Sequence, residues 1–155
     1  KEFTLALKLQ DFFQAYYHRA FAYEKLNMLD EAISDYTSII SLKATNSDFY
    51  VHRGILFFKK GNLEKALSDF NFAIFLDDNQ SAYYPRAYLK YSLNDFEEAL
   101  KDYDYLVEKG TGSSVIYFER GLIKKNLLLY QDAISDFEEA LLLNPEEKDA
   151  IIEKA

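Results

Sequence analysis

The arginines of this sequence share a spacing that suits ionic chemistry. Each of the four arginines is followed sixteen residues later by an aspartate. The pairs are Arg19 with Asp35, Arg53 with Asp69, Arg86 with Asp102 and Arg120 with Asp136. A planar guanidinium can bind a carboxylate through two parallel hydrogen bonds, and it can bind an anionic ligand in the same way. If a helical hairpin turns near the middle of the interval, both members of a pair lie at one level. We therefore favour a ladder of structural ion pairs over a row of anion-binding arginines.

Other candidates for catalysis or metal binding are weak. His18 and His52 stand directly before two of the arginines, but neither has a Cys or a second His within one helical turn. Pro85 and Glu119 stand at the corresponding positions before the other two arginines, so there is no series of metal ligands. We interpret both histidines as surface residues. The glycine-containing stretch 109–114 lacks the Lys-Ser or Lys-Thr of a phosphate-binding loop, and no nucleophile motif or HExxH occurs. We predict that the chain is not an enzyme and uses no metal and no cofactor.

A repeat of 33 or 34 residues positions these side chains. Each copy contains an Ala with an aromatic residue four positions later. These residues are Ala32, Ala66, Ala99 and Ala133, followed by Tyr36, Phe70, Tyr103 and Phe137. Sixteen residues before each Ala stands a Tyr, and a small residue follows that Tyr by four positions. These are Tyr16, Tyr50, Tyr83 and Tyr117, with Ala20, Gly54, Ala87 and Gly121. Residues four apart share one helix face, so each copy predicts a pair of helices.

The predicted pairs consist of a first helix, a tight turn and a second helix. First helices are expected at about 13–26, 47–60, 80–93 and 114–127, and second helices at about 29–43, 63–77, 96–109 and 130–143. Asn27, Gly61 and Asn94 permit the turns, whereas Leu128 takes this place in the fourth copy. After Asn144 and Pro145, a further helix is expected to run to the end of the sequence.

The recurring positions of the four copies resemble the pattern of the tetratricopeptide-repeat family. That pattern has an aromatic residue, a small residue, and then Ala followed by Phe or Tyr. The resemblance covers about residues 13–145, although arginines stand where the family has Leu, and Lys90 and Lys124 where it has Tyr. It implies an all-α fold, a right-handed α-solenoid of antiparallel helix–turn–helix repeats whose neighbours share one core. We expect a single domain over 1–155, with repeats over 13–46, 47–79, 80–113 and 114–147. Residues 1–12 would be the tail of a preceding helix, and 148–155 would begin a further or capping helix.

The resemblance also implies a binding surface. In the family, the residue after the leading aromatic and the residue after the small residue point into a concave groove. Here these residues are Tyr17, Val51, Tyr84 and Phe118, and Phe21, Ile55, Tyr88 and Leu122, with Phe58 and Tyr91 beside them. Family members that clamp a C-terminal carboxylate have Lys, Asn and Arg in these columns, and this chain has none there. We expect a protein or peptide segment with apolar side chains as the ligand, because a terminal carboxylate would lose its water without gaining a donor. Alternatively, these rings only pack one first helix on the next.

Composition excludes several other partners. The net charge is −8 and the basic residues do not cluster, so nucleic acid is not expected. No apolar run approaches twenty residues, which argues against a membrane partner. There is no Cys, and hence no disulfide. The sequence begins at Lys1 without a recognisable targeting signal, so we expect a segment of a longer protein and take the cytoplasm as its default location.

The predicted function is a protein–protein interaction module that holds a partner segment in a concave, aromatic-lined groove. The alternative is a purely structural part of a longer superhelix or a self-association element, in which the same protein fills the groove. A catalytic role would require a domain outside this sequence.

Overall fold

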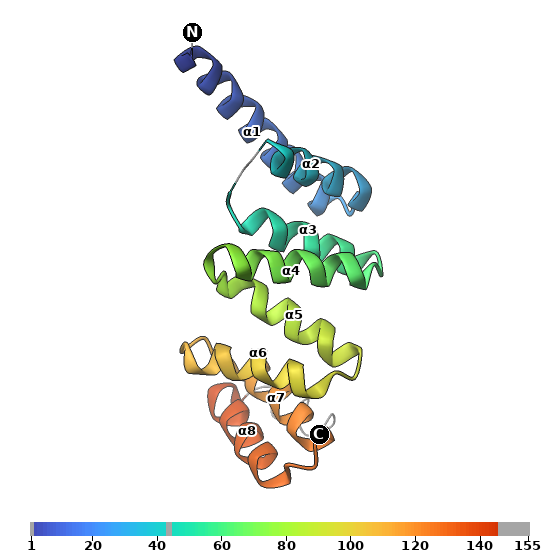
Figure 1. Cartoon of the computed structure of the whole chain (residues 1–155). Helices are drawn as coiled ribbons and strands as arrows, with labels where there is room; N and C mark the ends of the chain where they lie inside the picture. The colour runs from blue at the N-terminus through green and yellow to red at the C-terminus, as the bar shows by residue number, and fades with distance from the viewer. Residues whose placement is uncertain (1, 43–44, 146–155) are drawn as a thin grey trace. The chain divides into compact units, whose positions relative to one another are not determined.

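The computed structural model describes residues 2–42 and 45–145, and in these ranges it forms eight α-helices (Figure 1). They are α1 (Glu2–Lys25), α2 (Leu29–Ser41), α3 (Asp48–Lys59), α4 (Leu63–Asp77), α5 (Gln80–Ser92), α6 (Phe96–Glu108), α7 (Ser114–Asn126) and α8 (Tyr130–Leu143). Odd-numbered helices are the first helices of the repeats, and even-numbered helices are the second helices. Apart from the start of α1, the predicted ends agree with these bounds to within about two residues.

The N-terminal helix is longer than the sequence predicted. α1 runs from Glu2 to Lys25 without a break, so residues 2–12 extend the first helix. The predicted tail of a separate, preceding helix is therefore wrong for these residues. The physical reason is that no Gly, Pro or Asn occurs before Asn27 to end one helix and begin another. The further helix predicted after Pro145 lies outside the described residues.

All four hairpin turns have the same backbone geometry. One residue in each turn has a left-handed conformation, with φ between 57° and 75°: Asn27, Gly61, Asn94 and Leu128. The following amide donates to the carbonyl five residues back, as in the bond from Met28 N to Tyr23 O at 2.9 Å. This is the Schellman motif that ends many helices. Leu128 adopts it despite a conformational cost of about 1–2 kcal/mol for a residue with a Cβ.

The small residues of the repeat allow the two helices of a hairpin to approach closely. A methyl group on Gly54 would lie only 2.6 Å from Cε1 of Phe70, and one on Gly121 would lie 2.6 Å from Cε1 of Phe137. The aromatic ring of the second helix thus packs directly on the backbone of the first helix. Because that site has no spare volume, the small-residue column is a requirement of the fold.

The chain divides into two compact units, Lys1–Ala82 and Tyr83–Ala155, where the sequence predicted one domain. In unit 1, α2 packs against both α1 and α3, and α3 packs against α4. In unit 2, α7 packs against both α6 and α8. Such a division is compatible with a repeat chain, since each repeat contacts only its neighbours.

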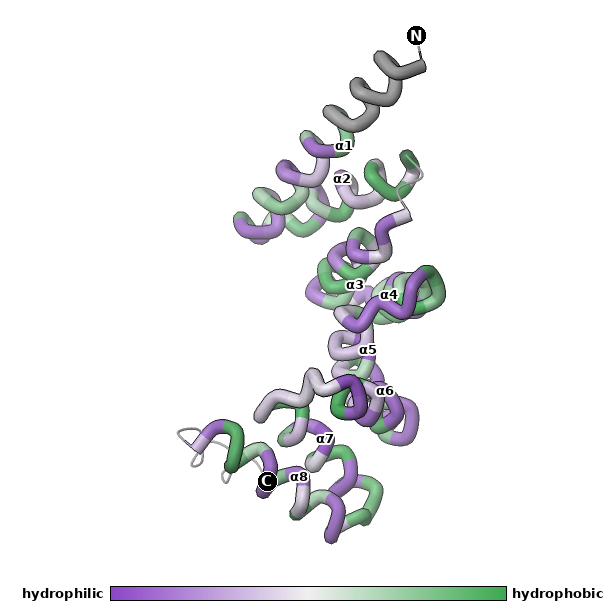
Figure 2. The backbone as a smooth tube through the Cα atoms, turned by 90° about the vertical axis from the view of Figure 1, so that its left-hand side faces the viewer, coloured by the Kyte–Doolittle hydropathy of each residue, from purple (hydrophilic) through white to green (hydrophobic). Residues whose placement is uncertain are grey.

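Hydrophobic and hydrophilic residues alternate along the helices of both units, as expected for amphipathic helices with one buried face (Figure 2). Among the described residues, no helix combines the length and the apolar character needed to cross a membrane.

Candidate functional site

The four predicted Arg–Asp pairs all form, each within its own helical hairpin. In every pair Nε of the arginine donates to Oδ2 of the aspartate and Nη2 donates to Oδ1, at 2.5–2.8 Å. The four aspartates are buried. Each guanidinium also lies over the leading tyrosine of its repeat, 5.2–5.7 Å from the ring centroid. Because each planar fork already holds a carboxylate, the geometry favours the ladder over an anion-binding row.

The two lysines that depart from the family pattern take part in the same ladder. Lys90 Nζ lies 3.0 Å from Asp102, and Lys124 Nζ lies 2.8 Å from Asp136. In unit 1 the equivalent positions are aromatic, and Arg53 lies 5.7 Å from the ring centroid of one of them, Phe57. In unit 2 each buried aspartate therefore faces two cations.

The arginines also link successive repeats, which the sequence analysis missed. Arg53 Nη1 donates to Thr37 in α2 at 3.2 Å, and Arg120 Nη1 donates to Asp104 in α6 at 2.9 Å. Both partners stand sixteen residues before the arginine. A search for polar residues sixteen positions before each arginine could have predicted these two contacts.

The predicted groove residues of unit 1 differ in exposure. Phe21 is 44% exposed, and Tyr17, Ile55 and Phe58 are partly buried. Val51 is only 5% exposed, because its short side chain ends within the core. Val51 therefore offers no contact surface, and its assignment to the groove needs correction. The remaining four residues stay candidates for binding.

Polar side chains lie beside these residues in unit 1. His52 stacks on the ring of Tyr36, with centroids 5.4 Å apart and planes 2° apart. The carboxylate of Glu24 lies 3.8 Å from His52 Nδ1 and 3.9 Å from Lys59 Nζ. His52 is thus held by packing, and among the described residues no group of His, Asp and Glu is suited to hold a metal ion.

The groove residues of unit 2 are exposed or partly buried. Tyr84 and Tyr88 are 36% and 41% exposed, and Tyr91, Phe118 and Leu122 are partly buried. One of them, Tyr84, contacts the acid Glu119, which the sequence indicated only as a break in the series of histidines.

Glu119 in α7 accepts hydrogen bonds from two phenols of unit 2. Tyr103 of α6 donates at 2.7 Å, and Tyr84 of α5 donates at 3.3 Å. Burial raises the pKa of Glu119 above its ordinary range, and the two phenol donors oppose this shift. Burial, followed by the charge of Glu119, raises the pKa of Tyr84 to about 12. The burial of Tyr103 raises the pKa of that phenol as well.

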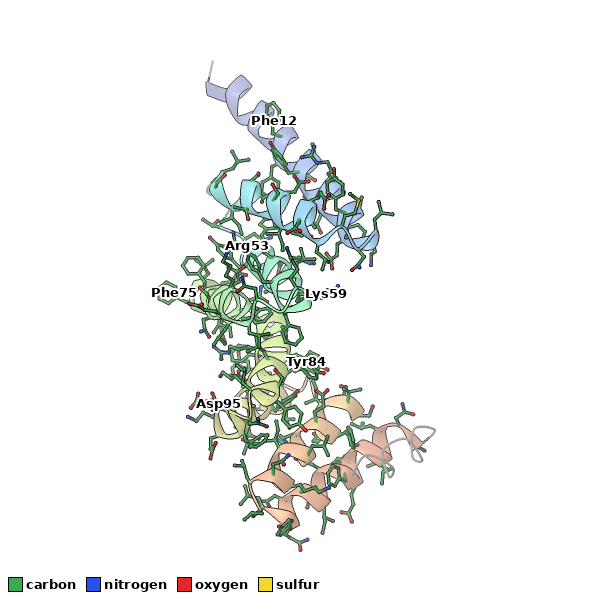
Figure 3. All side chains as sticks on the ribbon, turned by 90° about the vertical axis from the view of Figure 1, so that its right-hand side faces the viewer. Phe12, Arg53, Lys59, Phe75, Tyr84 and Asp95 are labelled. Atoms are coloured by element: carbon green, nitrogen blue, oxygen red, sulfur yellow. The ribbon has the colours of Figure 1, made fainter. Side chains whose placement is uncertain are left out.

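A second apolar surface lies on α4. Phe75 is 81% exposed, and Phe72 and Leu76 beside it are partly exposed. Phe72 packs on Tyr50, with centroids 4.6 Å apart, at a pocket of about 700 Å³ that Phe75 also lines. Within unit 1, Phe75 projects on the side opposite to Lys59 of α3 (Figure 3).

The chain resembles known proteins by repeat and by fold. The tetratricopeptide repeat family model matches residues 13–46 and 115–147. A structure of MamA from Desulfovibrio magneticus RS-1 has a TM-score of 0.83 at 18% identity, over 88% of this chain and 78% of that chain. A tetratricopeptide repeat protein from Parabacteroides merdae ATCC 43184 has a TM-score of 0.82 at 22% identity, over 93% and 60%.

A third similar structure was solved with a peptide. It is the first TPR of Spaghetti (RPAP3) bound to the HSP90 peptide SRMEEVD, with a TM-score of 0.70 at 26% identity, over 75% of this chain and 95% of that chain. No curated protein matches the sequence. The chain shares the all-α fold of these proteins, with helices packed as antiparallel pairs.

Proposed function

We propose that this chain is a tetratricopeptide-repeat protein and acts as an interaction module that binds a segment of another protein through aromatic and apolar side chains of its first helices. One observation carries the proposal: Phe21, Tyr84 and Tyr88 occupy one or other of the two groove columns and remain 36–44% exposed. Tetratricopeptide domains generally act as protein-interaction modules, which is consistent with this use.

Exposed aromatic side chains are well suited to carry binding energy. They bury a large area with few rotatable bonds, and aromatic residues are enriched among the residues that dominate interfaces. In unit 1 the proposed contacts are Tyr17, Phe21, Ile55 and Phe58. In unit 2 they are Tyr84, Tyr88, Tyr91, Phe118 and Leu122. The core aromatics of the second helices are excluded from this set, because they are buried against the first helices.

The chemistry of these columns argues against an acidic peptide terminus as the partner. The peptide bound to the Spaghetti domain, SRMEEVD, has acidic residues at three of its last four positions. In this chain the two columns hold no Lys, Arg or Asn, and the net charge is −8. A peptide with that many negative charges would meet apolar surface and a repulsive field. The partner segment is therefore apolar, with neutral or basic side chains between its apolar residues.

The test uses a peptide display library selected against the wild-type chain. Affinities of the selected peptides are measured by fluorescence anisotropy for wild type, Tyr84→Ala/Tyr88→Ala, Phe21→Ala and Phe75→Ala. The first two variants remove proposed contacts, and the third is a matched control that removes an exposed aromatic from α4. We expect the double variant to bind at least about 30-fold more weakly, since one anchor residue is worth about 2 kcal/mol. Circular dichroism confirms that each variant is folded.

Two results would overturn the proposal. One is a double variant that binds every selected peptide as wild type does. The other is a Phe75→Ala variant that loses binding while the groove variants keep it, which would move the site to α4.

Self-association is the second candidate function, and the exposed side chains of α4 favour it. Phe72, Phe75 and Leu76 give this helix an apolar outer face in unit 1, and such faces often mark interfaces. Sedimentation of the wild-type chain over a range of concentrations tests this reading. A monomer at all concentrations supports the binding module, whereas a dimer that Phe75→Ala dissociates supports self-association.

A further inference from the structure

Glu119, which is partly buried, differs in its partners from the buried aspartates of this chain. Asp35, Asp69, Asp102 and Asp136 each hold a guanidinium through two hydrogen bonds. Among the described residues, no Lys, Arg or His lies within ion-pair distance of Glu119, and its hydrogen-bond donors are two phenols. Phenols solvate a carboxylate but do not neutralise its charge. The site therefore keeps a partly buried negative charge that a cation would stabilise.

The surroundings of Glu119 suit an organic cation. Tyr103 is fully buried and Tyr84 meets it edge to face, with ring centroids 6.2 Å apart. Tyr88 lies one helical turn after Tyr84 on the same face of α5, and it is 41% exposed. Two tyrosines, one from α5 and one from α6, thus contact the carboxylate from α7, and Tyr88 lies one helical turn from the first of them. Aromatic faces attract Lys and Arg side chains, and the attraction grows when water is excluded.

We propose that Tyr84, Tyr88, Tyr103 and Glu119 form a subsite that receives the Lys or Arg side chain of a bound protein segment. The alkyl part of that side chain lies along the exposed rings of Tyr84 and Tyr88, and its charged end reaches the Glu119 carboxylate. The inference rests on the proposed function, because it names the chemistry of one residue in the segment that the module binds.

The subsite is specific to unit 2 among the described residues. In unit 1 the residue equivalent to Glu119 is His52, which stacks on Tyr36. The nearby carboxylate of Glu24 already has Lys59 at 3.9 Å and His52 at 3.8 Å. At the same offset along the sequence, Tyr84 and Tyr88 correspond to Tyr17 and Phe21, which are also aromatic, so the two units differ in the acid and not in the rings. A cation would therefore be stabilised less in unit 1 than in unit 2. We expect a Lys or Arg of the bound segment to lie at unit 2.

The direct test titrates two small probes into the isotope-labelled chain and follows the tyrosine ring signals by NMR. The probes are Nα-acetyl-lysine N-methylamide and its norleucine analogue, which has the same alkyl chain without the ammonium group. We expect the lysine probe to bind wild type about tenfold more tightly than the norleucine probe. Glu119→Gln and Tyr88→Leu should each remove most of this preference. Tyr88→Phe, which keeps the ring, should bind the lysine probe within about twofold of wild type.

Three results would overturn the inference: equal binding of the two probes, a Glu119→Gln variant that keeps the lysine preference, or a Tyr88→Leu variant that behaves as Tyr88→Phe does. Melting curves show whether each variant is folded.

The selected peptides separate this inference from the proposed function. If Tyr84→Ala/Tyr88→Ala loses the peptides while Glu119→Gln binds all of them as wild type does, the module stands and the cation subsite fails. If the double variant keeps every peptide, the proposed function fails, and the probe titration alone then decides whether the subsite exists.

Discussion

Replacing Asp136 by Asn should destabilise the fourth repeat far more than the same change at Asp35 destabilises the first. Asp136 is 4% exposed and holds two cations, Arg120 at 2.5 Å and Lys124 at 2.8 Å, whose side chains are 12% and 14% exposed. The variant removes the buried carboxylate of both cations, so that Lys124 loses its partner and Arg120 keeps only Asp104, in a site that water barely reaches. Breaking a buried ion pair from one side costs about 3–5 kcal/mol, and we expect a loss in this range.

Asp35 provides a matched control for that loss. Its bond to Arg19 has the same bidentate geometry, at 2.7 Å. The two pairs are also comparable in position, because one lies in the first and the other in the last of the four predicted repeats. However, the Arg19 side chain is 56% exposed, so water solvates the guanidinium once its partner is gone. The loss at Asp35→Asn should therefore be much smaller. Denaturant unfolding gives the overall loss, and native-state hydrogen exchange of the α2 and α8 amides assigns it to a repeat.

A second substitution tests the physical cause. If the loss at Asp136→Asn comes from buried cations that have lost this carboxylate, then removing Lys124 with Lys124→Met should restore part of the stability of Asp136→Asn. The same substitution in the wild-type background should not stabilise, because Asp136 then loses a partner. Equal losses at Asp35 and Asp136, or a further loss on adding Lys124→Met to Asp136→Asn, would refute the argument from burial.

Three further predictions concern the turns, the core and the site. Leu128→Asn should raise the free energy of unfolding by about 1 kcal/mol in denaturant melts, and Asn94→Leu should lower it by a similar amount, because Asn tolerates left-handed φ better than Leu does. Gly54→Ala should cost about 1–3 kcal/mol in the same assay, since the new methyl group meets the Phe70 ring at 2.6 Å; an unchanged midpoint would contradict the close approach. Burial raises the pKa of Glu119, so ionisation of this group as pH rises through that pKa lowers the stability of the fold. Glu119→Gln should therefore melt at a higher temperature than wild type near neutral pH, and the difference should shrink as pH falls below the raised pKa; a difference independent of pH would refute it.

Most of the helices could be predicted because they are short, recur in every copy of the repeat and, in most copies, end at a recognisable residue. Asn27, Gly61 and Asn94 mark the ends of first helices through their tolerance of left-handed φ. Leu128 carries no such mark, and its turn was predictable only because three other copies fixed the period. The extension of α1 was not predictable from the period, because no fifth copy precedes it to compare.

The site was less predictable than the fold because exposure depends on the length of a side chain as well as on its column. Val51 and Tyr84 occupy equivalent positions, yet Val51 is buried and Tyr84 reaches the surface. Glu119 was overlooked because a lone acid in a helix has no local signature, and its donor Tyr103 belongs to the preceding repeat. Contacts of this kind depend on how one repeat packs on the next, and a repeat pattern within one copy does not specify it.

The ion-pair ladder and the proposed binding surface are connected through charge. Each arginine of the chain is bound to a buried aspartate, so none of the four guanidinium groups is available for an acidic ligand. The pairs cancel in charge, and the net −8 therefore comes from acids outside the ladder. Because its arginines hold the buried aspartates, the chain is acidic overall. Its first helices present aromatic rings and, in unit 2, the Glu119 carboxylate, which has no ion-pair partner among the described residues. An acidic field attracts basic segments and repels acidic ones before contact is made. The same residues that hold the hairpins together thus favour the basic, apolar partner that the surface of unit 2 is proposed to bind.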